Sequence, residues 1–233
     1  MSISDSIKRL SLPLLAAVLT AMAPAPSQAV MLDLRYASLA TGEDRGPQDG
    51  VFDAFASPGA AGVANNGWTS LRTAMEFDLS ALPANAVIHS ATVHMAIGWV
   101  EGTRYLALHG YAGDGAVSLT DFSLNGLVGG WTLNPSSIPP TLQLLTFDAS
   151  SFVRGLLSSG EAFAGFNLRE DPPNKPNYLV LYFETRSPYY APRLSVDYTV
   201  RPVPEPVPIL LLAAGLMALA LPRLRRRTSR EAE

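Results

Sequence analysis

Glu76 and Asp78, two positions apart, are carboxylates that could form a catalytic pair like that of a glycosidase. They stand in residues 71–79, where apolar and polar residues alternate, so both are expected on one face of a β-strand. Residues two apart on a strand are separated by about 6.6 Å, within the ~5–10 Å that glycosidases require. Arg72 shares this face, and a charged, solvated sheet face accounts for all three residues. We therefore expect no enzymatic pair here.

A second group of carboxylates lies in residues 43–53, an acidic stretch that contains glycine. Calcium takes about 6–8 oxygen ligands from such loops. Asp44, Asp49 and Asp53 are therefore candidate calcium ligands, although the D-x-D-x-D-G pattern of a dedicated calcium loop is absent. We expect no cofactor, with a structural calcium ion as the alternative.

Aromatic residues offer a different chemistry, because exposed rings stack on the apolar face of a sugar. Trp68, Trp99 and Trp131 each follow a glycine, and Tyr189 and Tyr190 lie together in a proline-flanked stretch. These five residues are candidate glycan-binding residues. The alternative is that the tryptophans cover the core or the edges of the fold.

Motifs of other catalytic classes are missing. The chain has no cysteine, which excludes disulfides, thiolate metal sites and a cysteine nucleophile. His89, His94 and His109 are its only histidines; they form no H-E-x-x-H motif and are expected in loops or at the surface. A G-x-S-x-G elbow and a phosphate-binding loop are also absent. We expect a protein that is not an enzyme, with a polysaccharide-acting hydrolase or lyase as the least favoured alternative.

The charge of the chain is distributed unevenly. Residues 30–205 contain 10 Lys and Arg against 17 Asp and Glu, a net charge of −7. Nucleic acid is therefore not expected as a partner of this part. Basic residues gather near the C-terminus instead, at Arg223, Arg225, Arg226, Arg227 and Arg230.

Residues 1–29 have the layout of a secretory signal peptide. Lys8 and Arg9 precede an apolar run over residues 10–19, and a small-x-small cleavage site ends at Ala29. The run is too short to span ~30 Å of hydrocarbon. We expect export through the Sec machinery and cleavage after Ala29, with an uncleaved membrane anchor as the alternative.

The C-terminal segment, residues 201–233, has three parts. Prolines at 204, 206 and 208 hold an extended approach, residues 207–221 form an uncharged apolar run, and the arginine cluster follows. Fifteen helical residues reach about 22 Å, short of a full bilayer, but flanking residues or bilayer thinning can compensate. The arginines are expected to stay on the cytoplasmic side.

The order of these parts resembles a PEP-CTERM sorting signal. Its motif corresponds to Val203, Pro204, Glu205 and Pro206, followed by the apolar helix and the arginines. The resemblance implies recognition by exosortase, a membrane-embedded enzyme that acts near the Pro-Glu-Pro, in a bacterium that makes exopolysaccharide. It also implies transient anchoring in the inner membrane before release or attachment at the cell surface. A plain membrane anchor would explain the helix and the arginines but not the motif.

Between the two ends, alternating segments predict an all-β domain. In residues 71–79, Met75 and Phe77 are expected to face inward, and in residues 91–97, Val93, Met95 and Ile97. Further strands are expected at residues 104–108, 142–147, 164–168, 178–184 and 193–200. Residues 148–157 predict one short helix, which Gly160 ends. This pattern favours an antiparallel β-sandwich.

Three phrases in this domain are similar to the DNRLRE family: LRTAMEFDLSALPANAVIHSATVHM, FDASSFVRGLLSSGEAFAGFNLRE and FETRSPYYAPRLSVDYTV. The resemblance runs from Leu71 to Val200 and implies a jelly-roll sandwich related to carbohydrate-binding modules. We therefore expect a signal peptide over 1–29, a DNRLRE-like domain over 30–200 and the sorting signal over 201–233. The expected function is a non-enzymatic cell-surface or matrix protein that associates with exopolysaccharide; the alternative is a structural, adhesive surface protein with no specific ligand.

Overall fold

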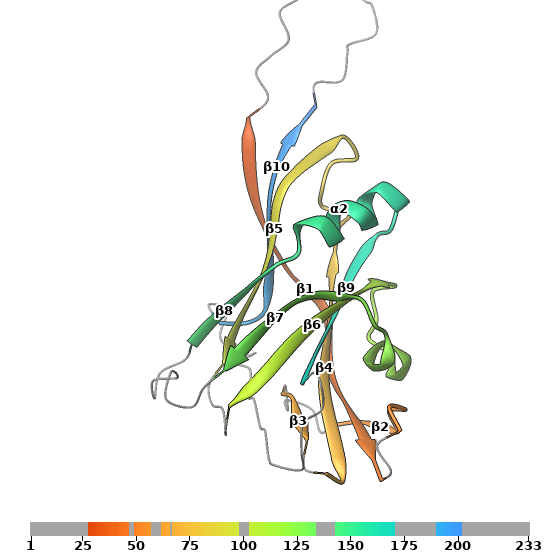
Figure 1. The fold of residues 1–233 in the computed structure, drawn as a ribbon. Coiled ribbons are helices and arrows are strands. Elements are labelled where there is room, and N and C mark those ends of the chain that lie inside the picture. The colour runs from red at the N-terminus through yellow and green to blue at the C-terminus, as the bar shows by residue number, and fades with distance from the viewer. Residues whose placement is uncertain are drawn as a thin grey trace, which may run out of the picture. The chain divides into compact units, whose positions relative to one another are not determined.

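The structure is a computed structural model, which describes residues 28–46, 49–56, 62–65, 67–97, 103–133, 143–170 and 190–201. The stretch Ser27–Val200 forms one compact unit. The expected signal peptide before Ala29, the expected strand over residues 178–184, and the sorting motif with its apolar run and arginines lie outside the described residues. Figure 1 shows the elements of the compact unit.

All strands of the described residues pair antiparallel. The expected all-β antiparallel class with one α-helix is therefore confirmed for this part of the chain. The strands are β1 (Ala29–Arg45), β2 (Ala54–Phe55), β3 (Ala64–Asn65), β4 (Thr69–Asp78), β5 (Ala86–Ile97), β6 (Arg104–Gly113), β7 (Leu127–Leu133), β8 (Gln143–Asp148), β9 (Phe163–Glu170) and β10 (Arg193–Val200). The helices are η1, a 3-10 helix over Leu119–Ser123, and the α-helix α2 over Ser150–Ser159.

Strand β1 joins two groups of strands. The sheet runs in the order β7-β6-β9-β4-β1-β10-β5-β8, while β2 adds to β1 and β3 to β4. The first half of β1, from Ala29 to Arg35, pairs with β10, and the second half, from Tyr36 to Arg45, pairs with β4. In Figure 1, β1 accordingly runs from beside β10 down to β2 and the lower end of β4. The two end strands approach each other, since a Cβ on Gly129 of β7 would lie 3.6 Å from Phe147 of β8.

The inner faces of both groups enclose the main core. The residues expected to face inward from β4 and β5 are all fully buried there. Phe166 of β9 connects the sheet to the helix, with its ring 5.9 Å from that of Phe77 and 5.3 Å from that of Phe152 in α2. Gly160 ends α2 in the left-handed conformation, at φ 79°, as the sequence predicts.

A smaller core lies on the outer face of the β4 group. Residues 114–126, which connect β6 to β7 and are called the cover segment below, place Phe122 against Phe52 at a ring distance of 5.1 Å. Arg72 stacks over the Phe52 ring at 5.0 Å and donates a hydrogen bond to the Phe122 carbonyl at 2.7 Å. Asn167 of β9 donates to the same carbonyl at 2.6 Å. The expectation that this face is solvated is therefore wrong, because a segment distant in sequence covers it.

Candidate functional site

The three candidate calcium ligands lie around the turn that follows β1. Asp44 accepts a hydrogen bond from the Gly50 N–H at 3.0 Å, Asp49 from the Val51 N–H at 3.0 Å, and Asp53 from the Arg45 N–H at 2.8 Å. Each carboxylate thus fixes the backbone of the turn. No group of three or more His, Cys, Asp or Glu placed to hold a metal is present in the described residues.

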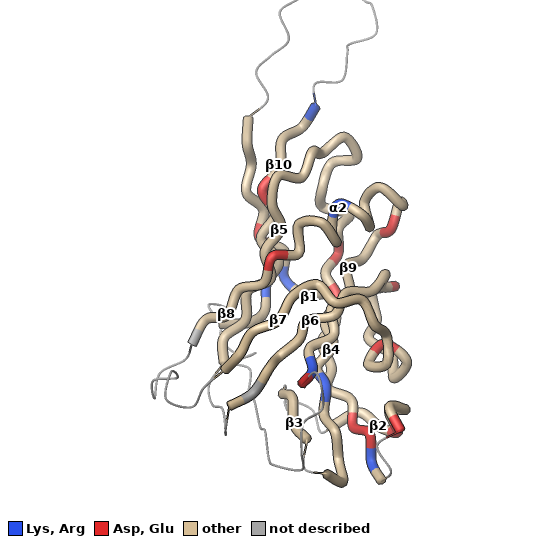
Figure 2. Tube along the Cα trace, viewed as in Figure 1, with Lys and Arg blue, Asp and Glu red and all other residues tan. Residues whose placement is uncertain are grey.

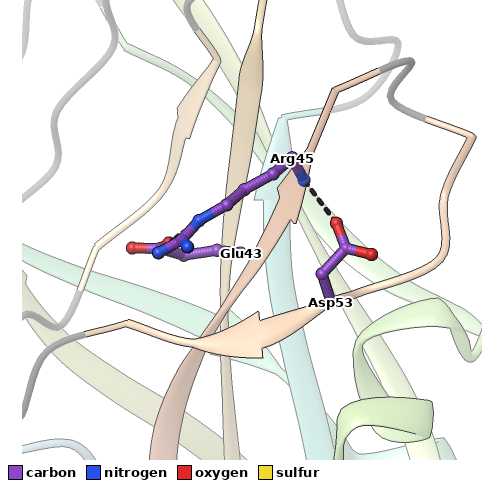
Figure 3. Close-up of polar contacts among 3 residues, drawn as sticks. All are labelled: Glu43, Arg45 and Asp53. Carbon is purple, nitrogen blue, oxygen red and sulfur yellow. Dashed lines mark hydrogen bonds and ion pairs between the residues drawn. The ribbon is translucent and has the colours of Figure 1, made fainter.

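Arg45 is the basic residue among these acids. Its Nε donates to Glu43 at 2.6 Å, and the same two side chains form an ion pair on the exposed surface. Figure 3 shows Arg45 between Glu43, which binds its guanidinium, and Asp53, which binds its backbone. Asp44 is only 2% exposed, and burial raises its pKa, with Asp49 and Asp53 adding to the rise and the Gly50 N–H opposing it.

Trp68 lies at the same end of the sheet. Arg45 pairs with Thr69, and the Gly46 N–H donates to the Trp68 carbonyl at 3.0 Å. The Trp68 side chain is 78% exposed. The structure therefore brings one glycan candidate next to the calcium candidates. We call this group the acidic tip: Glu43, Asp44, Arg45, Asp49, Asp53 and Trp68.

The other aromatic candidates lie on separate elements. Trp131 is 41% exposed on β7, which β6 and β9 separate from β4 in the sheet, and Tyr190 is 44% exposed in the turn before β10. Trp99 and Tyr189 lie outside the described residues. The pairing of the strands thus places Trp68 and Trp131 on strands that are not neighbours.

The carboxylates Glu76 and Asp78 have opposite environments. Asp78 is partly exposed and accepts the Ser80 N–H at 2.7 Å. Glu76 is fully buried beneath the cover segment, and its Oε2 accepts the Gly115 N–H at 2.6 Å. A carboxyl enclosed in this way cannot contact a substrate in the arrangement seen here.

Burial is the main cause that raises the pKa of Glu76, with Asp121 and Asp114 adding to the rise. Hydrogen bonding from Gly115 and the nearby Tyr111 hydroxyl opposes it. The Glu76 Oε1 and Tyr111 hydroxyl oxygens are both buried without a well-formed hydrogen bond among the described residues. The site is therefore a buried polar contact between the sheet and the cover segment, in which only some of the polar atoms have hydrogen-bond partners.

The histidines do not share one environment. His89 is exposed, His94 is half-buried, and His109 is only 4% exposed, so the expectation of three surface histidines is wrong for His109. Its Nδ1 accepts the Gly126 N–H at 3.3 Å and faces an Arg169 nitrogen at 3.4 Å, which favours a neutral ring. His109 thus helps to hold the end of the cover segment.

Strand pairing also produces a row of basic residues on the outer face of the β10 group. Arg35 of β1 pairs with Arg193 of β10, which in turn pairs with His94 of β5. No local pattern could reveal this row, because its members are far apart in the sequence and become neighbours only when the strands align.

No protein-family model and no curated protein matches the chain. Among the residues that the structure describes, no helix is long and apolar enough to cross a membrane.

Proposed function

We propose that this chain is an exported, non-enzymatic protein of the cell surface or extracellular matrix, sorted by an exosortase-type system and associated with exopolysaccharide. The observation that carries the proposal is the sequence order in the tail. Val203-Pro204-Glu205-Pro206 is followed directly by the apolar run over 207–221 and then by four arginines within residues 223–227. A proline-stiffened motif outside a short membrane helix is accessible to a membrane enzyme.

The boundaries of the folded unit support this proposal. Strand β10 ends at Val200, just before the motif, and β1 begins at Ala29, the proposed end of the signal peptide. Cleavage near Pro204 would leave every paired residue of β10 in the product. Cleavage after Ala29 would remove only the first residue of β1, which pairs with Thr199.

We further propose that the domain is a DNRLRE-like jelly-roll sandwich. Two groups of antiparallel strands share one core, and β1 passes from one group to the other. This arrangement supports a sandwich, since such folds bury the inner faces of two sheets against each other.

Association with glycan has support from the acidic tip. Trp68 presents a ring that is 78% exposed next to hydrogen-bonding side chains at one end of the sheet. Aromatic rings with a few neighbouring polar groups are the usual elements of sugar recognition.

Mass spectrometry of the protein from fractionated cells tests the sorting proposal. We expect a product that starts at Val30, ends near Val203–Pro206 and occurs in the surface or extracellular fraction. A matched variant, Pro204→Ala with Glu205→Gln, should keep the arginine-rich end and stay in the inner membrane. An intact chain in the cytosol, with the same mass in wild type and variant, would contradict the proposal.

A further inference from the structure

The row formed by Arg35, Arg193 and His94, called the basic row below, crosses three adjacent strands. Direct pairing places the three residues on one face, with Thr146 of β8 continuing the row after His94. Neighbouring strands lie about 4.8 Å apart, so the side chains start at this spacing along a line perpendicular to the strands. In Figure 2, blue stretches of β1 and β10 lie beside each other where these strands meet.

Like charges directly opposite each other destabilise a sheet. Here two arginines are opposite each other in an exported region whose net charge is −7. The Arg35 side chain is exposed, and it makes no hydrogen bond or ion pair among the described residues. The positive charge of Arg35 therefore lies at the surface without an acidic partner among the described residues.

The adjacent row of the same face carries the nearest acids. Asp33 pairs with Ser195, Ser195 with Thr92, and Thr92 with Asp148. Asp33 accepts a hydrogen bond from the Ser195 hydroxyl at 2.5 Å, and Asp148 accepts the Ser150 hydroxyl at 2.5 Å. Both acids thus have hydroxyl partners of their own, at opposite ends of that row.

We propose that the basic row binds the carboxylate groups of an acidic exopolysaccharide laid across β1, β10 and β5. Guanidinium groups match carboxylates in a two-pronged geometry. The two arginines lie side by side on the sheet face, and His94 next to them supplies a neutral ring, because burial and the neighbouring Arg193 lower its pKa. The hydroxyls of Thr146, at the end of the row, and of Thr92, beside it, offer hydrogen bonds to sugar hydroxyls. The inference rests on the proposed function for the source of the polymer.

A uronate-type polymer fits this face better than nucleic acid. Duplex DNA carries one charge per about 1.7 Å, far denser than cations set one strand apart at about 4.8 Å. Asp33 and Asp148 beside the row, and the acidic domain around it, also repel a dense polyanion. A polymer with one carboxylate per sugar matches the sparse charge of the row.

Binding of polygalacturonate to the mature protein, purified from cells, tests the inference, with neutral dextran as the uncharged control polymer. We expect binding to polygalacturonate alone, and a loss of about tenfold or more between 50 and 500 mM salt because screening weakens exposed charges. Arg35→Gln should weaken binding about threefold to fivefold, as removal of one exposed ion pair does. Arg35→Glu should weaken it further, with an unchanged melting temperature showing that the fold is intact.

Arg154→Gln provides the matched control, because it removes the same charge from an exposed arginine of α2 that lies outside both the basic row and the acidic tip. Equal effects of Arg154→Gln and Arg35→Gln, equal binding of dextran, or the absence of polygalacturonate binding would overturn the inference. Stronger binding to phosphatidylglycerol vesicles than to polygalacturonate would overturn it in favour of a lipid surface.

Matrix retention in cells separates this inference from the proposed function. If wild type and Arg35→Gln stay equally in the matrix and polygalacturonate does not bind, the inference about the basic row is wrong and the proposed function is unaffected. If polygalacturonate binds through Arg35 while the protein never leaves the cytosol, the proposed function is wrong and binding of acidic polysaccharide by the basic row is still supported.

Discussion

Glu76 and Asp78, two residues apart on β4, show how burial separates carboxyl groups that the sequence presents as equivalent. Glu76 lies beneath the cover segment, and burial raises its pKa. Asp78 receives hydrogen bonds from the Ser80 side chain and backbone, which lower its pKa. The two groups therefore contribute to stability with opposite dependence on pH.

We predict that Glu76→Gln gains stability relative to wild type as pH rises. A raised pKa means that the folded state binds the proton more tightly than the unfolded state. This contribution of Glu76 is complete below its ordinary pKa of 4.5 and is lost as pH rises through the raised value. A glutamine at this position has no charge to bury, and its amide can donate to the Tyr111 oxygen. Urea denaturation between pH 4 and pH 8 measures the difference.

Asp78→Asn is the matched control, and its sign is reversed. A lowered pKa contributes stability above the ordinary value of 3.8 and loses it as pH falls through the lowered value. Asp78→Asn should therefore be less stable than wild type at neutral pH, with the difference closing in acid. Parallel pH profiles for wild type and Glu76→Gln would show that Glu76 is not a strained buried acid.

At the scale of elements, the cover segment depends on glycine in β1. A Cβ on Gly42 would lie 2.5 Å from the Phe122 ring, which is itself fully buried. We predict that Gly42→Ala destabilises the protein by about 1–3 kcal/mol, the cost of overpacking a core. Chemical denaturation measures this change.

Gly155 of α2 offers the opposite test, because a Cβ there would meet nothing within 4 Å. Gly155→Ala should stabilise the protein by about 0.5–1 kcal/mol, since glycine is costly in a helix interior. A neutral or stabilising effect of Gly42→Ala would mean that Phe122 does not pack on β1 as described.

Sequence alternation predicts some elements well and others poorly, for local reasons. Residues 71–79 and 91–97 each keep one phase, so the inward residues of β4 and of the second half of β5 are predicted correctly, whereas the register of β5 shifts at His89. β1 does not keep one phase: Tyr36 pairs with Phe77 and Ser38 with Glu76, so a bulge at Ala37 shifts the phase midway. β7 contains Gly129 and Gly130 and lacks a strand signature.

The candidate sites follow the same division. Trp68 and the acids of residues 43–53 are recognisable individually from their residue types. Their proximity comes from the pairing of β1 with β4, and the basic row comes from the pairing of β1 with β10. The cover over Glu76 comes from residues 114–126, which local alternation around position 76 cannot indicate.

At the scale of the whole molecule, β1 links both groups of strands into one core. We predict a single unfolding transition, with far-UV circular dichroism and tryptophan fluorescence changing together. Leu34→Ala, at a buried position of β1, should cost about 2–4 kcal/mol and shift both signals equally.

Leu144→Ala on β8 is the control, because this side chain is 50% exposed. It should change the free energy of unfolding by only about 0.5 kcal/mol. Two separate transitions, or a shift of one signal alone in Leu34→Ala, would mean that β1 does not couple the two groups.

The adjacency of β1 and β10 has a mechanical consequence. Ala29 at the start of β1 pairs with Thr199 near the end of β10, so the two ends of the unit leave from the same end of the β1–β10 ladder. A force that pulls these ends apart peels the ladder open one hydrogen bond at a time, which resists far less than sliding all the bonds at once. A molecule held by a single end bears no such load, so freeing one terminus protects the sheet from the drag of moving fluid.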